Sequence, residues 1–332
     1  MNGEPSKPIF VLGSARSGTT LMASLVTASS EVAVYRAESM LLNGCERCYG
    51  ALSSNRAKVA FADDWVRSRQ FRRLGITEDA GRALVRSSAS YANLLRDVMS
   101  QLADRQEKGF WLDSTPGHVF SLQTIARAFP DAKIIHMVRD GRAVSASLRK
   151  LGWVGMRASD PEAAIQYSAL KWERSIEAFE RCAPSVSGQA MTVRYEDVVR
   201  TPDRVMEAVT AFIGLKPFDF QTALERRDRH EPTGDAVVSS NTAFEALGDG
   251  LSEVPIHRWR KTLSEKEIRL VETTVGETLA SLGYAPISEG RLSALDSVRA
   301  RSRSVMFNAK DIVRSVLPLR RLHSTPLEIA RH

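Results

Sequence analysis

The chain has little of what marks a secreted or a membrane-spanning protein. Its 332 residues include only three cysteines, Cys45, Cys48 and Cys182, which are too few for a disulfide framework. No run approaches the roughly 18 apolar residues that a membrane-spanning helix needs. The N-terminus also lacks the apolar stretch of a signal peptide. We therefore expect a cytoplasmic protein.

The composition shows none of the biases that mark a disordered or fibrous chain. Hydrophobic residues make up 43% and charged residues 26% of the sequence, which is ordinary for a globular protein. The length allows one large domain or two modest ones.

Positive charge is concentrated at the C-terminal end. The formal net charge is +7. Residues 291–332 contain nine Lys or Arg and three Asp or Glu, a net of +6, so residues 1–290 carry only +1. A nearly neutral body argues against a nucleic-acid partner. We expect one domain at 1–290 and a basic C-terminal extension at 291–332.

The extension has apolar residues near helical spacing among its arginines and lysines. These residues are Val298, Val305, Ile312 and Val316. Such a helix can lie peripherally on the anionic inner face of a membrane, or it can be solvated or loosely docked on the body. The sequence leaves both interpretations open, as it does the formation of a homodimer.

Short apolar runs alternate with amphipathic stretches, which predicts an α/β fold. We expect a P-loop-like parallel sheet flanked by helices, with a helical insertion near 57–107 and a turn-rich loop at 230–255. The predicted strands are 8–12, 32–35, 110–112, 133–138 and 190–194. The predicted helices are 19–28, 118–129, 144–148, 163–179, 202–213 and 264–282.

A glycine-rich turn lies between the first predicted strand and the first predicted helix. In this setting, backbone N–H groups and the positive helix end face one concavity and make an anion site. The loop differs from the ATPase loop G-x-x-x-x-G-K-[ST], because Thr19 stands where the lysine should be and Arg16 supplies the charge. This argues against an ordinary ATP or GTP enzyme. The candidate binding residues are Gly13, Ser14, Ala15, Arg16, Ser17, Gly18, Thr19 and Thr20.

The segment Ser14–Leu21 resembles the 5′-phosphosulfate loop of sulfotransferases that use 3′-phosphoadenosine 5′-phosphosulfate (PAPS). A second segment, Phe129–Ala143, resembles that family's strand ending in an arginine. The resemblance implies that Arg139 and Ser147 bind the 3′-phosphate. An arginine at a strand end can bind phosphate through two hydrogen bonds, and a serine in the next helix can donate beside it.

Two later segments extend the resemblance, which is closest to bacterial members and to the protein-tyrosine branch. Val193–Asp197 is similar to the segment whose tyrosine, here Tyr195, helps to hold the nucleotide. Ile256–Lys261 is similar to the loop that closes over the cofactor. It supplies Arg258, Trp259 and Arg260, and the spacing before Trp259 favours Arg258 over Arg260. The resemblance implies sulfuryl transfer from PAPS to a hydroxyl of a sugar, a lipid-linked molecule or a small molecule, with release of 3′,5′-ADP.

In sulfuryl transfer, charge accumulates on the leaving phosphate oxygen, where Arg16 is placed to act. The acceptor hydroxyl needs a general base, and two residues compete for this role. Glu38 stands almost where the tyrosine-sulfating branch has its glutamate, and His118 lies where other branches place a histidine. The family lysine before Thr115 is Ser114 here, so Arg16 or another residue must take over its role.

Positioning and charge stabilisation can carry such a transfer, and we expect no metal. Cys45 and Cys48 have metal-like spacing, but no second Cys or His pair accompanies them. Two other functions stay open at this point. The first is a kinase-type phosphotransferase, and the second is a relative that binds the nucleotide without catalysis.

Overall fold

The computed structural model describes residues 5–42, 44–151, 160–222, 253–290 and 292–316, together with Leu327. Most of the loop predicted at 230–255, and the side chains of Ile312 and Val316, lie outside this part of the chain. No helix in the described residues is long and apolar enough to cross a membrane.

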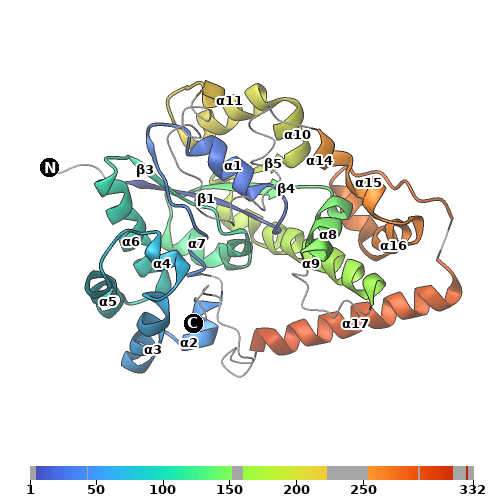
Figure 1. Ribbon diagram of the computed structural model, residues 1–332, viewed down its shortest axis with the longest axis horizontal. Helices are drawn as coiled ribbons and strands as arrows, with labels where there is room; N and C mark the ends of the chain where they lie inside the picture. The colour runs from blue at the N-terminus through green and yellow to red at the C-terminus, as the bar shows by residue number, and fades with distance from the viewer. Residues whose placement is uncertain are drawn as a thin grey trace.

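Five parallel strands form one sheet in the order β2-β3-β1-β4-β5, which confirms the predicted α/β fold (Figure 1). The strands are β1 (Lys7–Gly13), β2 (Val32–Ala33), β3 (Phe110–Asp113), β4 (Lys133–Val138) and β5 (Ala190–Arg194). β2 is shorter than predicted because the Gln106 side chain pairs with Val34. The amide of Gln106 accepts from Val34 N at 2.8 Å and donates to Val34 O at 3.0 Å, which replaces a strand partner.

The central strand β1 is buried on both faces, as its apolar run predicts. Because side chains alternate along a strand, Ile9 and Val11 face one layer while Phe10 and Leu12 face the other. The first layer contains α1 (Thr19–Val26), α10 (Tyr195–Arg200) and α11 (Pro202–Ile213). The second contains α6 (Tyr91–Arg105), η1 (Pro116–Ser121) and α7 (Leu122–Ala128). The helix predicted at 118–129 is therefore a 3₁₀ turn followed by an α-helix.

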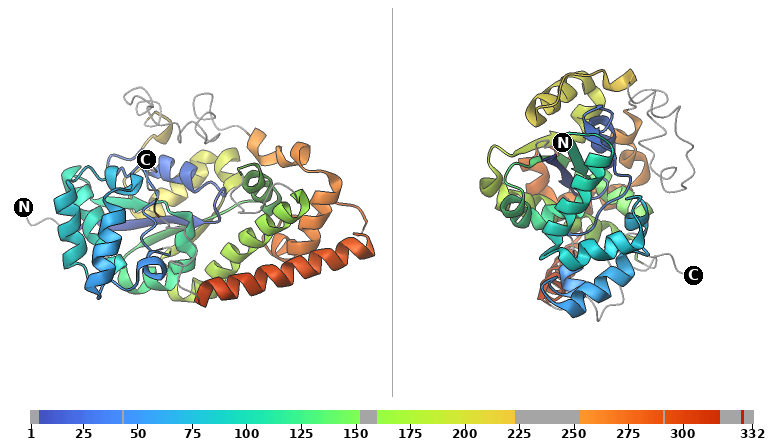
Figure 2. Two further views of the ribbon diagram at one scale, coloured as in Figure 1. Left: turned by 60° about the horizontal axis from the view of Figure 1, so that its bottom comes forward. Right: turned by 90° about the vertical axis from the view of Figure 1, so that its left-hand side faces the viewer.

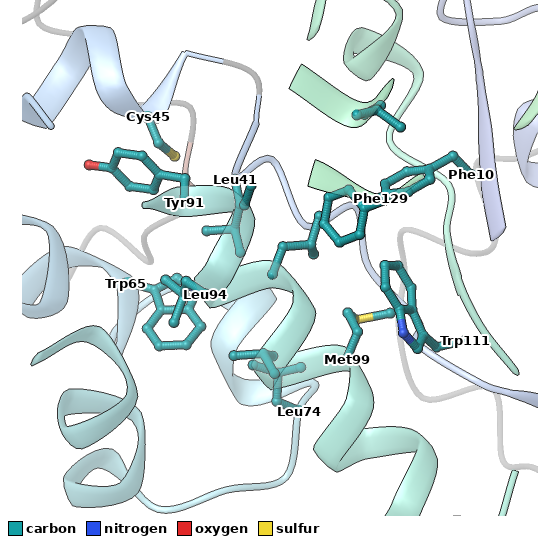
Figure 3. Packing of buried hydrophobic residues seen from close by; sticks show 14 of the residues in the cluster. Phe10, Leu41, Cys45, Trp65, Leu74, Tyr91, Leu94, Met99, Trp111 and Phe129 are labelled. Atoms are coloured by element: carbon teal, nitrogen blue, oxygen red, sulfur yellow. The ribbon is translucent and has the colours of Figure 1, made fainter. Parts of the chain in front are cut away.

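The predicted helical insertion consists of α2 (Cys45–Tyr49), α3 (Asn55–Trp65), α4 (Arg69–Arg72), α5 (Glu78–Ser87) and α6. The side chains of Ser54, Ser68, Thr77 and Ser90 cap four of these helices, each accepting a backbone N–H. The helices enclose aromatic side chains: Phe61 stacks on Trp65 at 5.7 Å and meets Tyr91 edge-on at 5.1 Å. Figure 3 shows how this cluster continues through Leu94 and Met99 to the side chains under the sheet.

A third group of helices lies beyond the end of β4. It comprises α8 (Gly141–Lys150), α9 (Pro161–Cys182), α14 (Val254–His257), α15 (Trp259–Thr262) and α16 (Glu265–Ser281). α17 (Ala294–Val316) belongs to the predicted extension and runs beside α9 (Figure 2). Gln166 donates to Ala300 O at 2.7 Å, and Arg303 pairs with Asp160 at 3.0 Å. The short η2 (Ala183–Val186) follows α9.

Candidate functional site

A cavity of about 580 Å³ opens where β1, β4 and β5 end. The carboxyl edge of a parallel sheet is the usual ligand position in such folds. Nine residues singled out in the sequence line it: Arg16, Gly18, Thr19, Thr20, Arg139, Ser147, Tyr195, Arg258 and Trp259. The four segments that carried the resemblance therefore meet at one place.

The glycine-rich loop reaches its shape through three residues with positive φ. Gly13 has φ 143°, Arg16 has φ 73° and Gly18 has φ 96°. A side chain at Gly18 would overlap the Tyr195 ring, and one at Gly13 would overlap the Met137 carbonyl. Arg16 is not a glycine and still adopts the left-handed region, which is typical of residues held for function. The loop thereby delivers Arg16 and the first turn of α1 to the cavity.

Arg16 and Arg139 lie side by side, although the sequence separates them widely. Arg16 Nε donates to Ser147 Oγ at 3.0 Å, and Arg139 Nη1 donates to the Arg16 carbonyl at 3.2 Å. Burial and the neighbouring Arg139 lower the pKa of Arg16. Two guanidinium groups this close repel each other, so an anion bound between them would offset their electrostatic repulsion.

The ends of β4 and β5 are tied together beneath these arginines. Asp140 N donates to Glu196 Oε1 at 3.0 Å, and Tyr284 donates its hydroxyl hydrogen to Glu196 Oε2 at 3.0 Å. Because Arg139 precedes Asp140 and Tyr195 precedes Glu196, this link places the Arg139 guanidinium 4.0 Å from the centre of the Tyr195 ring. Burial raises the pKa of Tyr195.

The segment around Trp259 closes one side of the cavity. Arg139 Nη2 donates to the Pro255 carbonyl at 2.6 Å. Trp259 is buried, and its ring lies 4.5 Å from the guanidinium of Arg142. Arg258 lines the cavity, whereas Arg260 lies 5.3 Å from the centre of the Trp259 ring and is not among the lining residues.

Arg142 is buried and fixes the position of Trp259. It pairs with Asp140 at 2.9 Å and with Glu272 at 2.5 Å. Although burial opposes its charge, the hydrogen bonds with these two carboxylates raise the pKa of Arg142. The network joins α8 to α16 behind the cavity, so the wall that carries Trp259 is supported by fully paired charges.

The cavity suits a ligand with several negative charges. Its lining includes Arg16, Arg139, Arg149, Lys150 and Arg258, and no carboxylate is among the described residues that line it. One buried donor of a lining residue, Arg139 Nε, has no hydrogen-bond partner in the described part of the protein. Buried donors without partners indicate a place for a missing acceptor. The residues present therefore fit a nucleotide with a phosphate at each end.

Arg149 and Lys150 were not singled out in the sequence. They occupy the last turn of α8, and Lys150 follows Ser147 by three residues, so it shares the cavity-facing side of the helix. That spacing could have identified Lys150. Arg149 is tied to Glu267 by an ion pair, whereas the exposed Lys150 side chain is placed to meet a phosphate.

The four loop residues Gly13, Ser14, Ala15 and Ser17 are not among those that line the cavity. Gly13, Ser14 and Ser17 are buried beneath the loop. Ser17 N donates to Ser14 O at 3.1 Å and closes the turn. These residues shape the loop, while Arg16 and Gly18–Thr20 face the cavity.

The two candidates for the general base lie in different surroundings. Glu38 is exposed and close enough to Arg16 for its charge to oppose the lowering of the Arg16 pKa. His118 is fully buried and faces Asp113, with Nδ1 and Oδ1 3.2 Å apart. Ser114, at the position of the family lysine, is half-buried between Asp113 and Thr115.

The described residues contain no group of His, Cys, Asp and Glu side chains arranged to hold a metal. Cys45 and Cys48 are both buried, and burial raises the pKa of Cys45. A buried thiol with a raised pKa is a poor nucleophile and a poor metal ligand. The pair lies within the hydrophobic cluster of the helical insertion.

The family model described as "Sulfotransferase family" matches residues 8–219. A putative protein-tyrosine sulfotransferase of Caenorhabditis briggsae is 28% identical over 280 residues, covering 83% of this chain and 88% of that protein. Protein-tyrosine sulfotransferase 1 of Danio rerio is 29% identical over 293 residues, covering 84% of this chain and 72% of that protein.

Solved structures show the same fold. The sulfotransferase domain of the Synechococcus PCC 7002 olefin synthase superposes with a TM-score of 0.58 at 20% identity, covering 84% of this chain and 97% of that one. The sulfotransferase domain of the curacin biosynthetic pathway gives a TM-score of 0.59 at 18% identity, covering 86% and 100%.

Proposed function

This chain belongs to the sulfotransferase family, enzymes that move a sulfuryl group from PAPS to a hydroxyl acceptor, and we propose which of its residues do so. Arg139 and Ser147 bind the 3′-phosphate, and the Gly18–Thr20 amides with Arg16 bind the 5′-phosphosulfate. The observation that carries this assignment is the cavity itself, because it places Arg16, Arg139 and Arg258 together without a lining carboxylate among the described residues.

Arg16 stabilises the charge that develops as transfer proceeds. PAPS supplies the sulfuryl group, and negative charge grows on the phosphate oxygen that is left behind. A preorganised donor aimed at that oxygen lowers the barrier. Arg16 is held by Ser147, and an arginine side chain keeps its charge in proteins. Arg16 thus takes the role of the family lysine that Ser114 replaces.

Glu38 is the general base that removes the proton of the acceptor hydroxyl. Two observations support this assignment: Glu38 is exposed, and its charge acts on the guanidinium of Arg16. Because two relatives are named protein-tyrosine sulfotransferases, a tyrosyl hydroxyl is the first acceptor to test. Its ordinary pKa of about 10 makes it a more accessible acid for a carboxylate base than an alcohol. Sugar, lipid-linked and small-molecule hydroxyls complete the panel.

The test compares Glu38→Gln with Glu78→Gln, a matched change on exposed helix α5. Labelled PAPS and a tyrosyl peptide are the substrates, and calorimetry measures 3′,5′-ADP binding. We expect Glu38→Gln to lower kcat by about 100-fold or more while 3′,5′-ADP binding stays within about two-fold. Glu78→Gln should behave as the unmodified protein does. A Glu38→Gln enzyme with normal kcat would refute the assignment of the base.

The two other functions predict different results in the same assays. A kinase-type phosphotransferase would turn over ATP with magnesium and leave PAPS untouched, but Thr19 stands at the position of its essential lysine. A relative without catalysis would bind 3′,5′-ADP tightly and sulfate no acceptor in the panel. The family assignment favours sulfuryl transfer over both.

We also propose that α17 rests on the anionic inner face of a membrane. One side of the helix packs on α9 through Ala300 and Phe307. The opposite side exposes Leu295, Val298, Val305 and Met306, and the exposed arginines Arg299 and Arg301 flank them. An apolar stripe bordered by arginines matches an anionic lipid surface.

Cosedimentation with phosphatidylserine-containing vesicles tests this contact. The double change Val298→Asp and Val305→Asp should reduce binding by about ten-fold. Val59→Asp, at an equally exposed valine on α3, should leave it unchanged. Undiminished binding of the double variant removes the membrane proposal. A change from dimer to monomer in that variant, measured by sedimentation equilibrium, would identify the stripe as a contact between copies.

A further inference from the structure

Asp113 and His118 form a buried polar pair that the proposed chemistry does not use. Asp113 ends β3 and His118 lies in η1, and both are almost completely inaccessible to solvent. Their nearest side-chain atoms are 3.2 Å apart. Burying a carboxylate beside an imidazole costs desolvation free energy unless both groups have polar partners. A buried pair of this kind therefore suggests a specific structural or functional role.

The partners of His118 determine its tautomer. Leu42 N–H points at His118 Nε2, with N and Nε2 3.3 Å apart. A backbone amide can only donate, so Nε2 carries no proton and the remaining proton of the neutral ring lies on Nδ1, facing Asp113. Burial alone would raise the pKa of Asp113, but its interactions with His118, Ser39 and Thr115 lower it. The Asp113 carboxylate therefore faces the Nδ1 side of the ring, with Oδ1 3.2 Å from Nδ1, while Nε2 accepts from Leu42.

Neighbouring residues hold the same short segment, Ser39–Leu42. Thr115 Oγ1 accepts from Met40 N at 3.4 Å, and Ser121 Oγ donates to Leu42 O at 2.5 Å. Met40 has φ 59°, a left-handed conformation that a methionine keeps only when its surroundings enforce it. The chain from the end of β3 through η1 therefore clamps the segment at several points.

Glu38 immediately precedes this clamped segment. We propose that Asp113 and His118 are positioning residues, which hold Ser39–Leu42 so that the Glu38 carboxylate stays beside Arg16 and the acceptor. His118, itself a candidate base in the sequence, acts through Glu38 and never exchanges a proton with substrate. This inference rests on the proposed role of Glu38.

The decisive experiment is a double-mutant cycle between His118→Leu and Glu38→Gln, with PAPS and the tyrosyl peptide. A small displacement of a catalytic group costs up to about 100-fold in rate. We expect His118→Leu alone to lower kcat by about 10- to 100-fold, with 3′,5′-ADP binding within about two-fold of the unmodified protein. In the Glu38→Gln background it should cause no further loss, because the group it positions is already gone.

A conservative variant separates positioning from a general loss of folding. Gln at position 118 keeps an oxygen for Leu42 N–H and an N–H₂ group for Asp113, so His118→Gln should retain kcat within about three-fold. If His118→Leu lowers kcat by the same factor in both Glu38 backgrounds, or leaves kcat unchanged in the unmodified one, the positioning role is wrong.

Hydrogen exchange tests the clamp without relying on turnover. Peptides covering Ser39–Leu42 should exchange at least ten-fold faster in His118→Leu than in the unmodified protein, and no faster in Glu38→Gln. Equal exchange in His118→Leu would overturn the inference even in an active enzyme. If exchange rises but the unmodified protein sulfates no acceptor, the clamp stands and the proposed function of Glu38 fails.

Discussion

The donor side, where the cavity opens at the ends of β1, β4 and β5, and the helical insertion α2–α6, which we propose as the acceptor side, are built by different forces. On the donor side, strand ends are joined by charges and directed hydrogen bonds, as between Asp140 and Glu196. On the acceptor side, helices α2–α6 enclose an aromatic cluster around Phe61 and Trp65. Figure 3 shows Trp65 and Tyr91 of this cluster. Donor recognition thus depends on fixed geometry, while the acceptor side depends on close packing.

This contrast explains why the two sides differ in how strictly they limit the identity of their residues. A phosphate site needs arginines and amides at set positions, because bidentate hydrogen bonds tolerate little displacement. A packed helical cluster accepts many apolar combinations of similar volume. The donor side is therefore recognisable as a family feature, and the acceptor side is free to vary with the acceptor.

The largest predicted effect concerns the packed side. Trp65 is almost completely buried and contacts both Phe61 and Phe71. Trp65→Ala should lower the free energy of unfolding by about 4 kcal/mol, from lost transfer energy and the cavity left behind. Chemical denaturation measures this, with the exposed Val59→Ala on the same helix as the control. A loss below about 1 kcal/mol would show that packing does not hold the acceptor side together.

The second effect concerns the charged side. Arg139→Ala removes a guanidinium that lies against Tyr195 and faces the cavity. We expect the dissociation constant of 3′,5′-ADP to rise by about 100-fold, since charge-assisted bonds to phosphate contribute about 1.5–3 kcal/mol each. Arg67→Ala, at an exposed arginine on the acceptor side, should leave it unchanged. Similar affinities in both variants would contradict the placement of the 3′-phosphate.

The third effect concerns how the stability of the protein depends on pH. His136 lies in β4 and stacks on Phe179 at 3.7 Å, and burial lowers its pKa to about 3. Its unfolded pKa is near 6.5, so below that pH the unfolded chain binds one more proton and stability falls.

Between pH 6.5 and pH 5 this residue should cost about 2 kcal/mol of stability. A His136→Gln variant lacks the titrating group and should lose correspondingly less over the same interval. Parallel pH dependences of the two proteins, measured by denaturation, would contradict the sign or the size of the shift.

The smallest predicted effect distinguishes two neighbouring arginines. Arg258→Ala should weaken 3′,5′-ADP binding by about ten-fold, because Arg258 lines the cavity from its exposed edge. Arg260→Ala should change it by less than two-fold, since Arg260 lies on Trp259 outside the lining. The reverse order would move the nucleotide contact to Arg260.

Much of the fold and the donor site could be predicted from the sequence. β4 and α11 begin and end where the apolar pattern and Pro202 indicated. The loop context indicated Arg16, and the family resemblance implied Arg139 and Ser147; all three line the cavity. Their mutual contact could not be predicted, because it depends on which strands are neighbours in the sheet.

The choice between Glu38 and His118 as the general base could not be made from the sequence, for a physical reason. In the sequence, His118 is a reasonable candidate for a general base, because imidazole can accept a proton. The structure shows that it is buried against Asp113 and Leu42 and does not reach solvent. Burial depends on contacts between segments that are far apart in the chain. Lys150 differs from His118 in this respect, because its three-residue spacing from Ser147 already indicates that both lie on one face of a helix.

The most direct test of the central claim is the transfer of label from ³⁵S-PAPS to a tyrosyl peptide by the unmodified protein and by Arg16→Ala. The unmodified protein should label the peptide. Arg16→Ala should keep its fold, judged by circular dichroism and thermal unfolding, and lose at least about 100-fold in rate. Normal transfer by a well-folded Arg16→Ala protein would contradict the account, because Arg16 would then have no part in the reaction.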